Sequence, residues 1–384
     1  MPRTRKLLSI GHSYVVALNR RLVNEMSLLG KVEWDVTAVA PNLMYGDLRP
    51  LQLESDPSEI CRLEGVPVYN SGRIHIMSYG WRLREIMQQN WDIVHCWEEP
   101  YILAGAQLAW WMPQNIPLIY RTAQSKSKNY IPPFNWLEQY SMNRAAGWIC
   151  SGNTVYDALK DRQGYAKPMR LIPLGVDIKH FRPSRVDGQK ILHLLNWDDS
   201  DIPVIGYLGR LVPEKGLPLL MNVLERLETP WRVLFVGTGA MESQLQTWAK
   251  LHPNQVRICT DVRHNDVVNY LNAMDILVAP SQSAKNWREQ FGRMLIEAFA
   301  CGIPVIGSDS GEIPYVIGQS GIVVGEKDEA GWVKAISELL TNPSKREQLS
   351  KEGLEKVHSE FSWEIVARKY LDFFSEIIET TTSQ

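Results

Sequence analysis

The feature that most constrains the fold of this chain is the alternation of short apolar runs with longer helical patterns. The apolar runs are rich in Val, Ile and Leu, and segments such as Leu217–Leu227 and Met241–Leu251 between them show helical spacing. Strands that alternate with helices form parallel sheets covered on both faces. The expected strands are Lys6–Ile10, Trp34–Ala40, Ile93–Trp97, Leu118–Arg121, Gly147–Cys150, Arg170–Pro173, Val204–Leu208, Arg232–Val236, Val256–Cys259, Ile276–Ala279, Pro304–Gly307 and Gly321–Val324.

The pattern starts afresh at Val204, so we expect two doubly wound units in tandem within the 384 residues. The boundary is expected in Pro173–Pro183, whose prolines, glycine and irregular pattern are typical of a linker. We therefore predict a first Rossmann-like domain over residues 1–175 and a second over residues 176–362. The segment Trp363–Ile378 is amphipathic and predicts a helix, and the last residues, ETTTSQ, are expected to be disordered.

Composition limits the class of protein. Apolar residues make up 45% and charged residues 22% of the chain, as in an ordinary soluble enzyme. The five cysteines form no C-x-x-C pair, which favours a reducing cytoplasm and argues against a structural zinc site. No stretch of about 18 apolar residues occurs, so no membrane-spanning helix is expected. The basic and then apolar N-terminus is not expected to be a signal peptide, because Gly11, His12 and Ser13 interrupt its apolar run.

Charge is unevenly distributed along the chain. Residues 1–175 hold 19 Lys and Arg against 15 Asp and Glu, whereas the whole chain has a net charge of −2. This excess is far too small to indicate nucleic-acid binding. A solvated face is the ordinary explanation, and peripheral association with an anionic membrane surface stays open as the alternative.

The segment Gly209–Gly216 (GRLVPEKG) follows a predicted strand and precedes a predicted helix. In open α/β sheets, ligands bind at the carboxyl ends of strands. Arg210 offers a planar fork of hydrogen-bond donors and Lys215 a mobile point charge, and together they suit a diphosphate. Taken alone, the loop is equally well explained as two exposed cations in a turn.

A sharper pattern lies in Glu289–Pro304 (EQFGRMLIEAFACGIP). A helix is expected from about Arg293 to Ala300, and its first free N–H groups form an anion site. Gly292, just ahead of this helix, lets a ligand approach the backbone closely.

Two carboxylates, those of Glu289 and Glu297, flank the start of this helix. They would be a poor arrangement for binding phosphate alone. The pair makes sense if both carboxylates accept hydrogen bonds from hydroxyl groups, because an unpaired buried carboxylate is costly. Two surface glutamates are the ordinary alternative.

The segment Glu289–Ile306 resembles the E-x7-E region of the retaining GT-B glycosyltransferases of family 4, also called group 1. The segments Gly209–Gly216, Ile172–Pro183 (IPLGVDIKHFRP) and Phe361–Leu371 (FSWEIVARKYL) are similar to the same family. The resemblance spans residues 172–371 and is looser in the first half. It implies an α/β fold of the GT-B type, in which two doubly wound Rossmann-like domains face each other across a cleft. It also implies that the C-terminal helix, residues 363–384, packs back onto the first domain.

The resemblance implies a role for individual residues. Glu289, Arg210 and Lys215 would be catalytic: the two cations would bind the donor diphosphate, and Glu289 would hold the hexose hydroxyls. Glu297 would hold the ribose hydroxyls, and the nucleobase would lie near Asp261–Arg263. The implied donor-binding residues are Gly209, Arg210, Lys215, Arg263, Phe291, Gly292, Arg293, Met294 and Glu297, of which Phe291 to Met294 would act through backbone N–H groups.

The activity implied is the retaining transfer of a hexose from a UDP- or GDP-sugar to an acceptor such as a glycan, a glycolipid or a small metabolite. No metal and no cofactor are expected, because Arg210, Lys215 and the helix N-terminus would stabilise the negative charge on the leaving diphosphate. The leaving phosphate would take the proton of the acceptor. A nucleotide-sugar-binding relative that acts as an epimerase or hydrolase, or that has lost catalysis, stays open as the alternative.

The first half departs from the family pattern at two points. Relatives read H-x-H-E-P after the third expected strand, whereas this chain has Trp97 at the second His position, followed by Glu98. Relatives often carry a Gly-Gly pair at the first turn, where this chain has Gly11 and His12. We place these four residues on the acceptor side, and we interpret His95 as a core histidine whose hydrogen bonds are satisfied.

Three further patterns have ordinary explanations. The segment Gly237–Gly239 mimics a dinucleotide-binding fingerprint, but the third glycine is missing and a tight turn is the better interpretation. The segment Asp198–Asp201 contains D-x-D, which we interpret as a solvated acidic loop. The segment Arg121–Trp136 mixes basic and aromatic residues and is a candidate acceptor loop, with an ordinary surface loop as the alternative.

Overall fold

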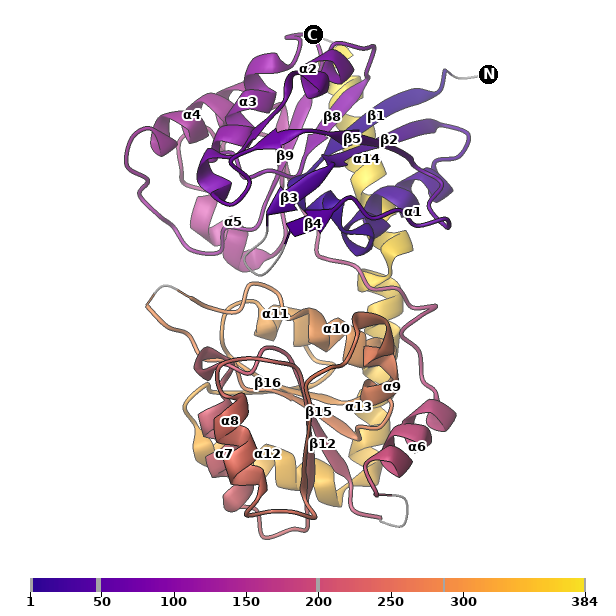
Figure 1. Ribbon diagram of the computed structural model, residues 1–384, viewed down its shortest axis with the longest axis vertical. Coiled ribbons are helices and arrows are strands. Elements are labelled where there is room, and N and C mark those ends of the chain that lie inside the picture. The colour runs from indigo at the N-terminus through magenta and orange to yellow at the C-terminus, as the bar shows by residue number, and fades with distance from the viewer. Residues whose placement is uncertain (1–2, 46–49, 198–200, 286, 383–384) are drawn as a thin grey trace. The chain divides into compact units, whose positions relative to one another are not determined.

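The structure of the protein is a computed structural model that describes residues 3–45, 50–197, 201–285 and 287–382. The chain divides into two compact units. The first is formed by Met1–Pro173 together with Trp363–Gln384, and the second by Leu174–Ser362. In each unit a parallel sheet carries helices on both faces (Figure 1).

The first unit is built on a sheet of seven strands. Strand order runs from β1 through β2 to β5 on one side and from β8 to β11 on the other, so that it reverses between β1 and β8. The carboxyl ends of two such strands form the crevice in which open α/β sheets bind ligands. In sheet order the strands are β11 (Met169–Leu171), β10 (Gly147–Cys150), β9 (Leu118–Thr122), β8 (Ile93–Cys96), β1 (Arg5–Ile10), β2 (Trp34–Pro41) and β5 (Arg62–Val66), and all their pairings are parallel.

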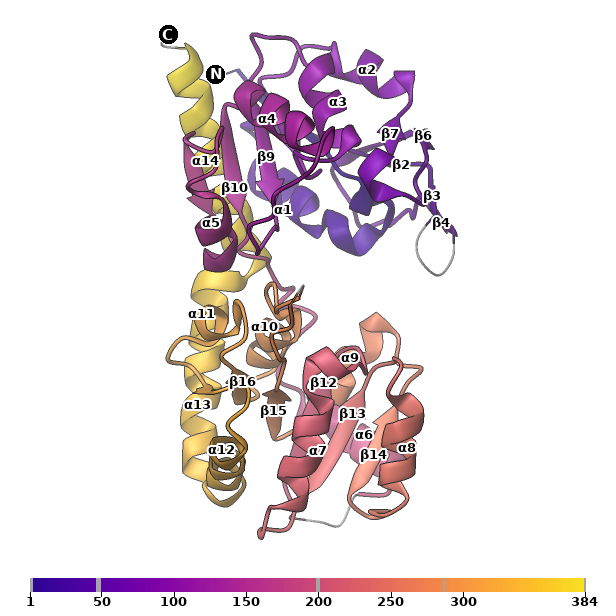
Figure 2. The ribbon, with the colours of Figure 1, turned by 90° about the vertical axis from the view of Figure 1, so that its left-hand side faces the viewer.

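Helices cover both faces of this sheet because successive strand residues point to opposite sides. Leu7 lies in the core under α1 (Arg21–Leu29) and α14 (Trp363–Thr382), whereas its neighbour Leu8 lies in the core on the other face. The helices α1 and α14 pack side by side (Figures 1 and 2). The other face carries α2 (Trp81–Met87), α3 (Leu103–Trp111), α4 (Phe134–Arg144) and α5 (Asn153–Leu159).

The end of α14 corrects one expectation. The residues from Glu379 onward were expected to be disordered, but the helix continues to Thr382. The carboxylate of Glu379 forms an ion pair with the Arg5 guanidinium at 3.1 Å. This contact holds the last turns of α14 next to β1. Residues 383 and 384 lie outside the described part of the chain.

The second unit is built on a sheet of six strands whose order reverses between β12 and β15. In sheet order the strands are β14 (Val256–Cys259), β13 (Arg232–Val236), β12 (Val204–Leu208), β15 (Ile276–Ala279), β16 (Val305–Ser308) and β17 (Ile322–Val324), all parallel. One face carries α6 (Arg185–Leu194), α9 (Val267–Leu271), α10 (Arg293–Ala300) and α11 (Ile313–Ile317). The other carries α7 (Leu217–Glu225), α8 (Glu242–Ala249) and α12 (Glu329–Thr341), and α13 (Pro343–Lys356) packs against α10 and α12.

Every strand predicted from the sequence is present, with its ends shifted by no more than two residues. The strand β5 was missed because its sequence, RLEGV, carries two charges and a glycine, as the edge of a sheet tolerates. Two short antiparallel pairs were also missed: β3 (Leu43–Tyr45) with β4 (Pro50–Gln52), and β6 (Val68–Tyr69) with β7 (Ser78–Tyr79). Of the acidic segment with D-x-D, residues 198–200 lie outside the described part of the chain.

Candidate functional site

The predicted diphosphate loop begins where β12 ends. Gly209 (φ 152°) and Gly216 (φ 78°) have backbone conformations that other residues rarely adopt. A Cβ atom on Gly216 would lie 1.7 Å from the carbonyl oxygen of Pro280, the residue that follows β15. Gly216 therefore allows the loops after β12 and β15 to touch where the strand order reverses.

Lys215 and Glu289 meet at this point. Lys215 Nζ lies 2.5 Å from Glu289 Oε2, and the two side chains are only 13% and 9% exposed. Ser281 Oγ donates a hydrogen bond to the same carboxylate oxygen at 3.0 Å, and the ring centre of Trp287 lies 5.1 Å from Lys215 Nζ. The structure thus joins two of the three predicted catalytic residues in one buried ion pair.

The third, Arg210, lies in the same loop but not in this pair. Its guanidinium Nη2 is 3.6 Å from Glu214 Oε1, and its side chain is 61% exposed. A cation at the surface of a loop keeps its hydration and its freedom to move. The structure therefore places Arg210 next to the site and not in contact with Glu289.

The helix α10 begins at Arg293, where the sequence predicts it. Gly292 precedes it in the left-handed conformation (φ 81°, ψ 62°), so the backbone turns sharply into the helix. The amides of Arg293 and Met294 belong to the first turn, which leaves N–H groups without intrahelical partners. The side chain of Phe291 packs in the core against Phe361, with ring centres 6.0 Å apart, so this residue offers a ligand only its backbone.

Glu297 lies one turn inside α10 and is buried. Burial raises the pKa of its carboxyl to about 7, against the opposing effect of the Arg293 charge. Within the described residues, no hydrogen bond reaches this carboxylate. A buried carboxylate is stabilised in its ionised form by hydrogen-bond donors, and hydroxyl groups are such donors.

Arg263 lies apart from the pair of Lys215 and Glu289. It is exposed and precedes the short helix η5 (His264–Asp266), beyond the end of β14. Since β13 separates β14 from β12, Arg263 shares the carboxyl edge of the sheet with Lys215 but lies two strands away.

In the first unit, the structure joins His12 and Glu98 directly. His12 follows β1 and Glu98 follows β8, the two strands between which the order reverses. Glu98 is fully buried and accepts hydrogen bonds from the backbone N–H of His12 (2.5 Å), from His12 Nδ1 (2.5 Å) and from the hydroxyl of Tyr79 (2.5 Å). Gly11 precedes this contact, and a Cβ atom there would lie 2.9 Å from Cβ of Trp97.

The neighbouring aromatic residues are part of the core. The Arg121 guanidinium lies 4.0 Å from the ring centre of Trp97, and the His95 ring lies 5.5 Å from the same residue. His95 is fully buried, as predicted, and its Nδ1 bonds Ser9 Oγ at 2.9 Å. The prediction that its hydrogen bonds are satisfied is only half right, because Nε2 has no partner in the described residues. Burial and the charge of Arg121 lower the pKa of His95 to about 3.

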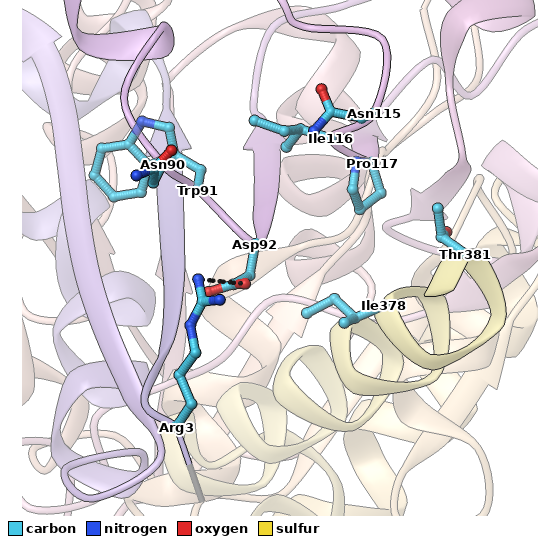
Figure 3. Close-up of a pocket in the computed structure, with 9 residues that line it drawn as sticks. All are labelled: Arg3, Asn90, Trp91, Asp92, Asn115, Ile116, Pro117, Ile378 and Thr381. Atoms are coloured by element: carbon cyan, nitrogen blue, oxygen red, sulfur yellow. Dashed lines mark hydrogen bonds and ion pairs between the residues drawn. The ribbon is translucent and has the colours of Figure 1, made fainter. Parts of the chain in front are cut away.

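A pocket of about 540 Å³ lies at the opposite edge of the first sheet (Figure 3). Asp92, which precedes β8, pairs there with Arg3 at 3.3 Å, and Ile378 and Thr381 of α14 line the same hollow. These residues lie at the amino ends of the strands, away from the edge where the predicted site residues gather.

The described residues contain neither a cluster suited to a metal ion nor a helix suited to crossing a membrane. Across residues 3–45, 50–197, 201–285 and 287–382, no group of three or more His, Cys, Asp or Glu side chains could hold a metal ion. No helix in that part of the chain is long and apolar enough to cross a membrane.

Sequence reasoning missed Ser281 and Tyr79. Ser281 had a usable signal, because it stands directly after a predicted strand at the ligand-binding edge. Tyr79 had none: it belongs to β7, a two-residue strand without a recognisable pattern, and meets Glu98 only in the folded chain.

Two models of known protein families match most of the chain. Residues 197–356 match the family model described as glycosyl transferases group 1. Residues 19–180 match the model described as glycosyltransferase family 4. The first match lies within the second unit, and the second match covers most of the first unit and extends past Pro173 to residue 180.

Among curated proteins, one similar relative is the GDP-mannose-dependent monoacylated alpha-(1-6)-phosphatidylinositol monomannoside mannosyltransferase of Corynebacterium glutamicum. It is 30% identical over 204 residues, which cover 52% of this chain and 54% of the relative. The chain spans about half the length of the first curated relatives that it matches.

Two solved structures share the fold over nearly the whole chain. Sucrose-phosphate synthase from Thermosynechococcus elongatus superposes with a TM-score of 0.74 at 20% identity, covering 98% of this chain and all of that one. HepE of Anabaena, solved in complex with UDP, superposes with a TM-score of 0.74 at 16% identity, covering 97% of this chain and all of that one.

Proposed function

The chain belongs to the group 1 glycosyltransferases and has their two-domain GT-B fold, and on that premise we propose that it transfers a hexose from a nucleoside-diphosphate sugar to an acceptor. Transfer proceeds with retention of the anomeric configuration and without a metal ion. The observation that carries this proposal is the buried ion pair of Lys215 and Glu289, at the reversal of strand order and just ahead of α10 in the chain.

The donor in this proposal is a UDP- or GDP-sugar. Support comes from the UDP bound to HepE and from the GDP-mannose dependence of the corynebacterial relative. In this chain, Glu297 holds the ribose hydroxyls and Glu289 the hexose hydroxyls, because both are buried carboxylates that hydroxyl groups can satisfy. The nucleobase lies beside Arg263.

The mechanism follows from charge. The bond between the anomeric carbon and the diphosphate breaks, its electron pair goes to the diphosphate, and the acceptor oxygen bonds to the carbon. Lys215 and the first amides of α10 stabilise the negative charge that develops, and the exposed Arg210 of the same loop adds a second positive charge. The proton of the acceptor passes to the leaving phosphate, so the atoms balance without a protein base.

The test is a panel of UDP- and GDP-sugars scored for release of the nucleoside diphosphate in the presence of EDTA. We expect turnover of at least one donor, an unchanged anomeric configuration in the product, and a loss of about 100- to 1,000-fold for Lys215→Ala. Strict dependence on a divalent metal would overturn the metal-independent mechanism. Release of free sugar or an epimerised donor, with no transfer to any acceptor, would favour the hydrolase or epimerase alternative.

We also propose a cytoplasmic protein that associates peripherally with the anionic inner face of a membrane. The five cysteines are present as thiols and form no disulfide with one another, as a reducing compartment maintains them. Between α3 and α4 of the first unit lies a largely apolar hollow of about 510 Å³, whose lining includes Trp110 and Tyr140. Trp110 and Trp136 are 74% and 62% exposed, and Trp and Tyr are the residues that favour membrane interfaces.

Charge supports a bilayer as the occupant of this surface. The segment from Tyr101 to Leu137, which forms α3 and leads into α4, contains no Asp or Glu but does contain Lys126 and Lys128. Basic residues next to an aromatic surface attract anionic lipids by about 1 kcal/mol each.

Sedimentation with phosphatidylglycerol vesicles tests this proposal. We expect binding that the double variant Trp110→Ala, Trp136→Ala weakens, whereas Leu251→Ala, an equally exposed apolar residue of the second unit, leaves it unchanged. Equal binding by all three proteins would contradict it. A different outcome is that the unaltered protein does not bind vesicles but associates with itself, and that only the double variant abolishes this self-association. That result would identify the surface as a contact between two copies of the chain.

A further inference from the structure

The contact between His12 and Glu98 has a geometry that the donor chemistry does not require. His12 opens the short helix η1 (His12–Val15) directly after β1, and Glu98 follows β8. These strands are neighbours in the sheet, and their carboxyl ends form the ligand-binding crevice of the first unit. The pair therefore lies where a ligand of this unit would bind.

Glu98 fixes the orientation of the His12 ring. Its two oxygens accept three hydrogen bonds, one from the His12 backbone, one from His12 Nδ1 and one from the Tyr79 hydroxyl. A carboxylate can only accept, so Nδ1 must carry the proton and Nε2 is the remaining ring nitrogen. The His12 side chain keeps 26% exposure, whereas Glu98 has none, so the ring is supported from inside and reachable from outside.

The pKa values of His12, Glu98 and Tyr79 are shifted by the contacts among these three residues and by burial. Burial lowers the pKa of His12, but the charge and hydrogen bond of Glu98 and the charge of Glu99 outweigh it, so that the pKa lies above its usual value. Burial raises the pKa of Glu98, but the charge of His12 and the bonds from His12 and Tyr79 bring it below its usual value. Burial raises the pKa of Tyr79 well above the usual range, so its hydroxyl stays a donor.

A purely structural role would need only part of this arrangement. The bonds from the His12 backbone and from Tyr79 already fasten the turn after β1 to Glu98. His95, by contrast, shows what a structural histidine looks like here: it is sealed in the core, with no route for its free nitrogen to a ligand. The His12 ring is partly exposed and oriented, and its neutral form is limited to one tautomer, which are the properties of a group that binds a substrate proton.

We propose that His12 Nε2 accepts a hydrogen bond from the acceptor hydroxyl that receives the sugar, with Glu98 and Tyr79 as positioning residues. The inference rests on the proposed glycosyl transfer and names the residue of the first unit that holds its second substrate. His12 orients the hydroxyl oxygen for bond formation at the anomeric carbon. The proton then passes to the leaving diphosphate, so His12 ends the reaction in its starting state.

Two substitutions of His12 distinguish the role of its Nδ1 atom from the role of its Nε2 atom. His12→Asn keeps a donor near Nδ1 for Glu98 but has nothing in the place of Nε2, whereas His12→Gln reaches closer to the position of Nε2. The assay uses the UDP- or GDP-sugar that passes the donor panel, with water and n-octyl β-D-glucopyranoside as probe acceptors. We expect His12→Asn to lower kcat/KM for the acceptor by about 10- to 100-fold and His12→Gln to restore part of it, with the affinity for the nucleoside diphosphate unchanged.

A pH profile distinguishes a positioned imidazole from a structural contact. Only neutral His12 accepts a hydrogen bond at Nε2, so activity should rise with pH through the pKa of His12. Glu98→Gln removes the main charge that keeps this pKa up, so the acidic limb should move to lower pH, while Tyr79→Phe keeps the charge of Glu98 and should move it less. Circular dichroism checks that each variant is folded, and His12→Asn, which leaves Glu98 intact, carries the test if Glu98→Gln is not.

The outcomes separate the two proposals. Failure of the unaltered protein to turn over any donor would contradict the proposed function itself. Turnover that His12→Asn leaves unchanged, or an acidic limb that Glu98→Gln does not move, would overturn the role of His12 and leave the glycosyltransferase activity standing.

Discussion

Two buried carboxylates of the second unit differ in what holds them. Glu289 is bound by Lys215 and Ser281, whereas Glu297 receives no hydrogen bond from the described residues. Glu289 is therefore paired with Lys215, the cation that we propose binds the diphosphate. In the proposed reaction, donor binding exchanges this pair for two new ones, Lys215 with phosphate and Glu289 with hexose hydroxyls.

This exchange predicts different effects for the two carboxylates. Glu289→Ala should abolish transfer but leave the affinity for the nucleoside diphosphate nearly intact, because Lys215 becomes free for phosphate. Glu297→Ala should weaken that affinity about tenfold or more by removing the acceptor for the ribose hydroxyls. Isothermal titration with UDP and GDP measures both affinities, and equal losses for the two variants would contradict the assignment.

Glu297 also predicts a pH dependence of binding. Its pKa of about 7 lies above the usual value because the carboxyl is buried, and ribose hydroxyls favour the ionised form. Affinity for the nucleoside diphosphate should therefore rise between pH 6 and pH 8, by up to about tenfold per pH unit below the pKa.

Glu297→Gln is the control for this titration. The terminal phosphate of the ligand itself ionises near pH 6, but it does so equally with both proteins. The dependence that remains in Glu297→Gln belongs to the ligand, and the difference between the two proteins belongs to Glu297. Identical slopes would show that Glu297 does not titrate in this range.

At the scale of elements, strands were predictable because they are buried on both faces. A run such as Val204–Leu208 is apolar throughout and is bounded by a proline and a glycine, so pattern alone locates it. The edge strand β5 is not apolar throughout, because one side of it has no partner strand. Local sequence therefore predicts the interior of each sheet and three edge strands, β11, β14 and β17, but misses β5, whose residues are not apolar throughout.

Site contacts were predictable only as far as one loop or one helix. The start of α10 after Gly292 follows from local signals, and the structure places it as predicted. The ion pair between Lys215 and Glu289 depends on β12 and β15 being neighbours in the sheet, which no local pattern states. The contact of Glu98 with Tyr79 likewise depends on tertiary structure.

Gly216 provides a test of how the loops after β12 and β15 fit together. Its φ of 78° and the 1.7 Å gap to the Pro280 oxygen leave no room for a side chain. Gly216→Ala should cost about 2 kcal/mol or more and lower the Tm of the second unit by roughly 4–8 °C. Gly325→Ala is the matched control, because its Cβ would meet Asp328 at an ordinary 3.4 Å. Calorimetry that finds equal Tm values for both variants would refute this account of the loop.

At the scale of the whole molecule, the chain leaves the first unit after Pro173 and returns to it at Trp363. The first unit is therefore complete only when the last helix has been made. The buried side chains of α14 are Val366, Ala367, Tyr370, Leu371, Phe373, Phe374 and Ile377, which pack in the core on the α1 face of the sheet.

This arrangement predicts that deletion of residues 363–384 unfolds the first unit and spares the second. Burial of one large apolar side chain contributes about 1.5–3 kcal/mol, so the loss of these side chains approaches or exceeds the usual 5–15 kcal/mol stability of a domain. The shortened protein should be cleaved rapidly within residues 3–173 by a protease, while a fragment containing residues 174–362 persists and still binds the nucleoside diphosphate. Deletion of residues 381–384 alone removes none of the buried side chains and should leave both units resistant. A first unit that resists cleavage without α14 would show that its core is stable without the returning helix.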